Sequence, residues 1–189
     1  YAGIDAANLT IENGSVVDIL ATESNCNAAF ISFHGGTTGG NLSVSNSKVV
    51  AKSLFPGLFA EGNLTIDGGS VQSTSTVDSA LWASGDLTIK GGAKVTLGGV
   101  YPAGCGGDFT VYAAEIDAKN TNTDNIPALL DSPVINGDFD LTQAVAVDSE
   151  GTTIDLIEHD GAEQAKGFLH LYKNVHFITS EKSVTYSFP

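Results

Sequence analysis

The sequence contains no arginine, and its eight basic residues are all lysines against 22 acidic residues, so the formal net charge is −14. Proteins that bind nucleic acid need positive charge to contact phosphates, so this balance argues against a nucleic-acid partner. A polyanionic partner would need a bridging cation. There is also no run of about 20 apolar residues, as a membrane-spanning helix requires, and no membrane insertion is expected.

Signatures of catalysis are missing too. The sequence has neither a nucleophile elbow nor a phosphate-binding loop. No histidine has metal-ligand spacing; the four are His34, His159, His170 and His176. An enzyme is therefore not expected. Abundant Ser, Thr, Asn and Gly beside few lysines are typical of a secreted or surface protein.

What the sequence does contain is a repeat. Residues 57–71 are GLFAEGNLTIDGGSV and residues 80–95 are ALWASGDLTIKGGAKV, which places Asn63 and Asp86 at equivalent positions 23 residues apart. Further copies of the Asn/Asp-Leu-Thr-Ile core begin at Asn8, Asn41, Asp108 and, in degraded form, Asp138. Two longer spacings, of 33 residues before Asn41 and 30 before Asp138, predict insertions at 20–40 and 119–136. A fixed period of this length indicates a stacked array.

Each repeat alternates with period two, so that Leu64 and Ile66 share one face of a strand and Thr65 takes the other. Glycine pairs such as 68–69 then turn the chain. Three short strands in about 22 residues describe one coil of a right-handed parallel β-helix. Two columns of side chains are expected in its interior. They are Leu9, Leu42, Leu64, Leu87, Phe109 and Phe139, and Ile11, Val44, Ile66, Ile89, Val111 and Leu141.

The coils are expected over residues 1–141 of a single domain, with residues 142–189 forming a largely antiparallel cap. Within that cap, 151–158, 167–173, 175–179 and 183–188 are predicted as strands. The first residues already match the repeat, which predicts that a leader was removed or that the chain was excised from a longer protein. Cys26 and Cys105 fall in different coils, which favours two buried free thiols over a disulfide.

Three aromatic residues are the candidate ligand-binding site. Leu58 and Leu81 are expected to point inward, so Phe59 and Trp82 point outward, and alignment of Val100 with them adds Tyr101. Because neighbouring strands lie about 4.8 Å apart, the three rings would form a flat strip that suits the apolar faces of sugar rings. The alternative is an aromatic ladder covered by the cap or by another subunit.

Acidic and amide side chains near the bends are candidates for other roles. Carboxylates on adjacent coils could hold Ca²⁺, although no spacing is diagnostic and the metal ligands stay unknown. These residues are Asp5, Glu12, Glu61, Asp67 and Asp78. The column of Asn and Asp residues that begins at Asn8 is predicted to be a turn ladder whose side chains bond local backbone.

The phrase Gly-Leu-x-Ala-x-Gly-Asn/Asp-Leu-Thr-Ile-x-Gly-Gly-x-Val is clear at 57–71 and 80–95 and partial at 2–16 and 108–116. It resembles the repeat of a family of bacterial surface β-helix proteins, the carbohydrate-binding domain proteins of the clostridial cellulose- and polygalacturonate-binding type. The resemblance covers about residues 1–141. It implies a location at the cell surface, and binding of calcium and of acidic polysaccharide. No particular ligand residue carries over.

Three functional hypotheses follow. The first is a non-catalytic extracellular polysaccharide-binding or adhesion module that uses Phe59, Trp82 and Tyr101, with Ca²⁺ as a possible cofactor. The second is a structural spacer or adhesin segment of a larger surface protein. The third, a pectin-type lyase or hydrolase, is the least favoured. Residues 122–124 and 34–35 are similar to Asn-Thr-Asp and His-Gly motifs of polygalacturonases, but their order is reversed. The paired aspartates of those enzymes and the arginine base typical of pectate lyases are absent.

Overall fold

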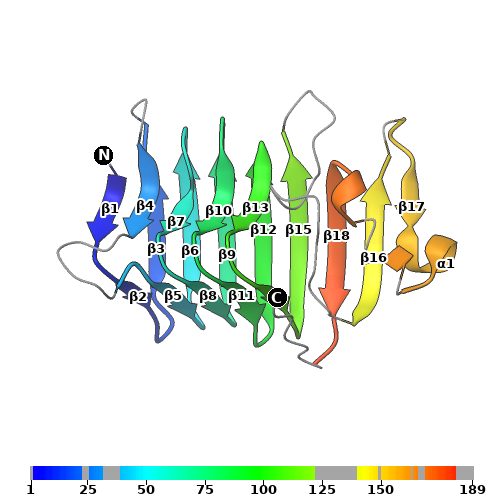
Figure 1. Cartoon of the computed structure of the whole chain (residues 1–189), viewed down its shortest axis with the longest axis horizontal. Coiled ribbons are helices and arrows are strands. Elements are labelled where there is room, and N and C mark those ends of the chain that lie inside the picture. The colour runs from blue at the N-terminus through cyan, green and yellow to red at the C-terminus, as the bar shows by residue number, and fades with distance from the viewer. Residues whose placement is uncertain are drawn as a thin grey trace.

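The computed structural model describes residues 2–22, 26–31, 39–121, 140–148, 150–162, 164–165 and 169–181. Within them the chain forms a β-solenoid of about five turns, in which short strands stack coil upon coil along the long axis of the molecule (Figure 1). Three parallel sheets form the walls of the solenoid, and each coil contributes one strand to each sheet. The predicted parallel β-solenoid with coils of about 22 residues is therefore confirmed.

The sheets are numbered here in the order in which the chain enters them. The first sheet contains β1 (Ala2–Ala6), β4 (Asn27–Ile31), β7 (Leu58–Ala60), β10 (Ser79–Ala83) and β13 (Tyr101–Cys105). The second contains β2 (Leu9–Ile11), β5 (Leu42–Ser45), β8 (Leu64–Asp67), β11 (Leu87–Lys90) and β14 (Phe109–Val111). The parallel part of the third contains β3 (Val16–Leu20), β6 (Lys48–Ser53), β9 (Ser70–Ser75), β12 (Ala93–Gly99) and β15 (Ala114–Asn120).

The interior columns form as the alternation predicts over five coils. Leu64 pairs with Leu87 and Ile66 with Ile89, and all four side chains are fully buried. Burial of each such side chain contributes roughly 1.5–3 kcal/mol, so the two columns are a large part of the stabilising core. Gly69, at φ +75°, has no room for a side chain, because a Cβ there would lie 2.3 Å from the carbonyl oxygen of Ser47.

The sixth copy of the repeat does not join these columns. Leu141 belongs to β16 (Leu141–Val147) of the third sheet, where it pairs with Thr179 rather than stacking on Val111. Asp138 and Phe139 lie outside the described residues. The parallel coils therefore end at β15, and the prediction that they continue to Leu141 was wrong.

One predicted insertion contains a regular strand. Residues 27–31 form β4, which pairs with β1 and β7 inside the first sheet. Its small residues, Ala28 and Ala29, gave too weak an apolar signal to be recognised as a strand. Similarly, Lys119 and Asn120 belong to β15. Of the residues assigned to the two insertions, 23–25, 32–38 and 122–136 lie outside the described part of the chain.

After the last coil the third sheet continues in antiparallel fashion. β18 (Asn174–Thr179) pairs with β15, β16 pairs with β18, and β17 (Thr153–Asp155) forms the edge. The strand predicted at 175–179 is confirmed as part of β18, and 183–188 lies outside the described residues. The strand predicted at 151–158 is confirmed in part as β17, whereas residues 156–158 belong to helix α1 (Leu156–Asp160). Of the strand predicted at 167–173, residues 167–168 lie outside the described residues, and 169–171 form the 3₁₀ helix η1 (Leu169–Leu171) instead. Helix α1 begins there because the Asp155 carboxylate accepts hydrogen bonds from the backbone N–H groups of Ile157 and Glu158.

Cys26 and Cys105 are both free thiols, as predicted, but only Cys26 is buried and Cys105 is half-buried. In the part of the chain that the structure describes, no helix has the length and apolar character needed to cross a membrane.

Candidate functional site

Phe59 and Trp82 lie side by side on the outside of the first sheet. The two residues are directly paired between β7 and β10, next to Leu58 and Leu81, which are paired in the same way and fully buried. Both aromatic side chains are half-buried. The Trp82 indole Nε1–H donates to the Ser84 hydroxyl at 3.4 Å. These two residues are called the aromatic pair below.

Tyr101 is not part of this surface, which corrects the predicted strip. It pairs with Ser79, and Gly104 occupies the position opposite Trp82. The prediction aligned Val100 with Leu81, whereas the structure aligns Ala103 with it. The signal that was missed is the constant sequence distance between the inward residue and the Asn/Asp position that follows it. Leu81 stands five positions before Asp86, and Ala103 stands five positions before Asp108.

Sequence reasoning also missed Phe30, which occupies the same register position as Phe59 one coil earlier. Aromatic residues therefore occupy this column on three consecutive coils, at Phe30, Phe59 and Trp82. The segment Ala28-Ala29-Phe30-Ile31 has the same apolar-apolar-aromatic-apolar order as Ala80-Leu81-Trp82-Ala83. That order was the signal that could have revealed it.

The Asn/Asp column is a ladder, but its hydrogen bonds run between coils rather than to local backbone. The side-chain Oδ1 of Asn63 accepts from the backbone N–H of Asp86 at 2.9 Å, and the Oδ1 of Asp86 accepts from Asp108 at 2.9 Å. Asn8 and Asn41 make the same contact with the next coil. These side chains are occupied by scaffold bonds, which explains their regular repetition without a ligand.

The acidic residues considered for calcium do not converge. Within the described ranges, no three His, Cys, Asp or Glu side chains gather into a group that could hold a metal ion. Asp67 instead forms an ion pair with Lys90 at 3.3 Å. The hydrogen bond from Lys90 to Asp67 and the negative charge of Asp67 raise the pKa of Lys90, and Tyr112 acts in the same direction. Asp78 accepts a hydrogen bond from the backbone N–H of Ser79.

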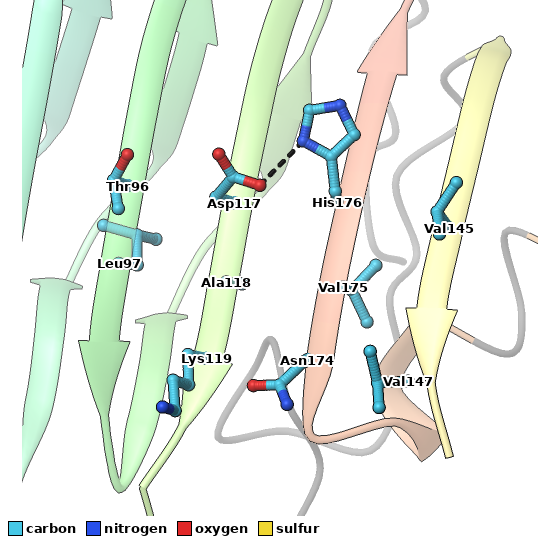
Figure 2. A pocket seen from close by; sticks show the side chains of 10 residues that line it. All are labelled: Thr96, Leu97, Asp117, Ala118, Lys119, Val145, Val147, Asn174, Val175 and His176. Atoms are coloured by element: carbon cyan, nitrogen blue, oxygen red, sulfur yellow. Dashed lines mark hydrogen bonds and ion pairs between the residues drawn. The ribbon is translucent and has the colours of Figure 1, made fainter. Parts of the chain in front are cut away.

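A second surface, on the third sheet, was not anticipated. A hollow of about 250 Å³ crosses β12, β15, β18 and β16 where the parallel coils meet the antiparallel strands (Figure 2). We call it the third-sheet hollow. It is lined by Thr96, Leu97, Asp117, Ala118, Lys119, Val145, Val147, Asn174, Val175 and His176.

A hydrogen-bonded pair of side chains in the lining of this hollow joins the parallel and antiparallel parts of the sheet. His176 Nδ1 on β18 lies 2.7 Å from Asp117 Oδ1 on β15, and the two residues are directly paired across the strands (Figure 2). Lys119 and Asn174 form the next outward pair. Val145 and Val147 provide an aliphatic wall on the far side. Because β15 and β18 are distant in sequence and antiparallel, no local motif marks this arrangement.

The outer face of the third sheet differs in charge from the rest of the chain. Its outward positions carry four lysines and four acidic residues, which cancel. They are Lys48, Lys52, Lys94 and Lys119, and Asp18, Glu115, Asp117 and Asp155. The net charge of −14 therefore resides on the remaining residues. An anionic ligand would therefore meet no net repulsion from the charges on the strands of this face.

The chemistry of the hollow suits binding. His176, which is held by the Asp117 carboxylate, and the Asn174 amide offer hydrogen bonds. The Lys119 ammonium group adds one positive charge beside the aliphatic side chains of Val145 and Val147. Of the other histidines, His159 bonds the neighbouring Asp160 at 2.8 Å in an exposed position. His34 lies outside the described residues, and so does the side chain of His170.

Comparison of the chain with models of protein families, with curated proteins and with solved structures finds no match.

Proposed function

We propose that this chain is a non-catalytic, extracellular polysaccharide-binding module that binds its ligand on the outside of the first sheet. The observation that carries the proposal is the aromatic pair, in which Phe59 and Trp82 occupy equivalent, half-exposed positions on consecutive coils. Paired strands hold the two ring positions about 4.8 Å apart. A rigid scaffold that fixes ring spacing lowers the entropy cost of binding an extended polymer.

The third-sheet hollow is a second candidate surface, suited to a charged polymer. Lys119 forms no ion pair with any described residue, whereas Lys90 and Lys94 are paired with Asp67 and Glu115. It is therefore available to a carboxylate or hydroxyl group of a sugar. Since the whole chain is strongly acidic, an acidic polysaccharide would be helped by a bridging cation, and Ca²⁺ belongs to the proposal for this reason.

The deciding experiment is retention of the purified chain on a glycan array and on insoluble polysaccharides, with and without chelator. Trp82→Ala should weaken retention about tenfold, equivalent to about 1.4 kcal/mol, because the ring supplies most of the apolar contact. Trp82→Phe should preserve most of the binding. Thr88→Ala, on the outside of the second sheet, is the matched control and should leave retention unchanged.

Separate variants locate the ligand. Lys119→Ala tests the third-sheet hollow, and a loss that depends on sugar charge would place the acidic group there. If Trp82→Ala and Lys119→Ala both bind as the unchanged chain does, neither surface is the binding site.

A structural spacer or adhesin segment is the second candidate, because a stack of coils bridges distance without needing a ligand. Complete absence of retention across glycans would favour it over polysaccharide binding. The pectin-type lyase or hydrolase is retained as a third outcome. It requires product release from pectin that is abolished by substitution of an acidic pair, with folding unchanged.

A further inference from the structure

The end of the solenoid formed by β1, β2 and β3, called the open end below, is less completely buried than the coils behind it. Each of these strands is terminal in its sheet among the described strands (Figure 1). The inward residues Ile4, Leu9 and Val17 are half-exposed. On the following coil, Leu42 is 1% exposed and Val49 is 0% exposed. One inward apolar residue in each of the three sheets is therefore partly exposed at this end, while Ile11 on β2 and Ile19 on β3 stay buried.

The outer side of β3 adds to this apolar surface. Val16 is 75% exposed and Leu20 is 66% exposed, whereas their partners on the next coil are Lys48 and Lys52. Terminal strands are usually protected from pairing by lysines or other charges. On β3 aliphatic residues take the positions of Lys48 and Lys52, and Asp18 between them is the single charge on this side of the strand. The edge is therefore less protected by charge than its neighbour β6.

The hydrogen bonds of the Asn/Asp ladder all run in the same direction along the solenoid, which determines what the open end can bind. In every contact of the ladder, the side chain of the earlier coil accepts the backbone N–H of the later coil. Asn8 uses its own Oδ1 for Asn41. Its backbone N–H therefore faces the position where one more coil would supply an acceptor.

We propose that the open end is an interaction surface for one further coil of the same repeat type, stacked in parallel on β1, β2 and β3. The occupant is a polypeptide coil with aliphatic residues over Ile4, Leu9 and Val17 and with an Asn or Asp over Asn8. It completes the pairing of three strand edges and buries the exposed interior residues. This inference is independent of the proposed sugar binding.

A second copy of the chain fits the open end less well. Two open ends related by a two-fold axis would bring strands together antiparallel and would place one Asn8 N–H against another, with no acceptor between them. The opposite end of a second copy offers β13 and β14 as terminal strands, but its third sheet continues into β18. Only a parallel coil matches all three sheets.

The test adds a coil to the complete chain. A copy of residues 57–77 placed directly before Tyr1 puts the copied Leu58 23 residues ahead of Ile4, which is the spacing of Leu58 and Leu81 in the chain itself. Two control fusions carry Leu64→Ser with Ile66→Ser, or Asn63→Ala, in the copy alone. Amide hydrogen exchange at Leu9 and Val17 and the urea midpoint are measured for all versions.

The intact copy should raise amide protection at Leu9 and Val17 by about tenfold or more, because an end strand that frays becomes an internal strand. The serine control should give no protection, and the Asn63→Ala control should give less than the intact copy. Equal protection from the intact copy and the serine control would overturn the proposal, as would a copy that is cleaved by protease without any effect on β2 or β3. Concentration-dependent dimerisation of the unfused chain that Leu20→Lys abolishes would assign the open end to self-association instead.

Discussion

At the scale of single residues, Cys105 shows how burial against the core of the solenoid changes the acidity of a side chain. It ends β13, lies half-buried against the core, and its Sγ is 3.4 Å from the carbonyl oxygen of Gly107. Burial raises the pKa of the Cys105 thiol from 9.0 to about 11, with the nearby Asp86 and Asp108 charges acting in the same direction. The thiol therefore stays protonated at a pH where an exposed cysteine ionises.

This shift predicts slow alkylation. In a Cys26→Ala background at pH 9, about one Cys105 side chain in a hundred should be thiolate, so iodoacetamide should react far more slowly than with the denatured chain. Because the folded pKa is higher than the unfolded one, the free energy of unfolding should be unaffected below pH 9 and should fall between pH 9 and 11. Cys105→Ala should remove that fall. Alkylation of the native protein as fast as that of the denatured chain would contradict the prediction.

At the scale of one strand and its corner, the ladder can be tested at Asp86. Asp86→Ala leaves the Asp108 backbone N–H without its acceptor, and should lower the free energy of unfolding by about 1 kcal/mol. Asp86→Asn keeps the acceptor and removes a carboxylate next to Asp108, so it should be neutral or slightly stabilising. Urea denaturation measures both. Equal losses in the two variants would mean that the side-chain bond does not contribute.

The composition of individual strands also determines which of them could be predicted from the sequence. Leucine and isoleucine on alternate positions, as at Leu64 and Ile66, mark the strands of the second sheet clearly, so the register of that sheet was predictable. Alanine at inward positions carries little apolar signal. For this reason β4, whose inward residue is Ala29, was not predicted as a strand. The register of β13 was predicted wrongly because its inward residue is Ala103, and Tyr101 was therefore assigned to the wrong position.

The antiparallel end was harder to predict for a different reason. The pairing of Asp117 with His176 joins segments 59 residues apart without a shared motif. Alternation alone suggests a strand but not its partner, so the third-sheet hollow could not be foreseen. Helix α1 was recognisable in principle, because Asp155 followed by Glu158 is the pattern of a helix start.

At the scale of the whole molecule, β18 connects the solenoid to its antiparallel end, and Phe177 anchors it. This side chain is fully buried, and its residue pairs with Ile116 on one side and Ala144 on the other. Phe177→Ala should cost about 3–5 kcal/mol and loosen β16 together with β18. Chemical denaturation and amide exchange at Ile116 measure the effect.

The matched control is His176→Ala on the same strand. It removes a partly exposed pair with Asp117, which should cost no more than about 1 kcal/mol. Similar losses from the two variants would show that outward contacts, rather than core burial, hold the antiparallel strands in place.

The order of these strands has a consequence for synthesis on the ribosome. β15 is complete at Asn120, but its partner β18 begins at Asn174, 54 residues later. At about 5–20 residues per second, the growing chain shows this strand edge to the cytosol or translocon for about 3–10 s. Glu115, Asp117 and Lys119 line its outer side, and their charges discourage neighbouring nascent chains from pairing with it during that interval. A nascent chain stalled before β18 emerges would keep this edge unpaired.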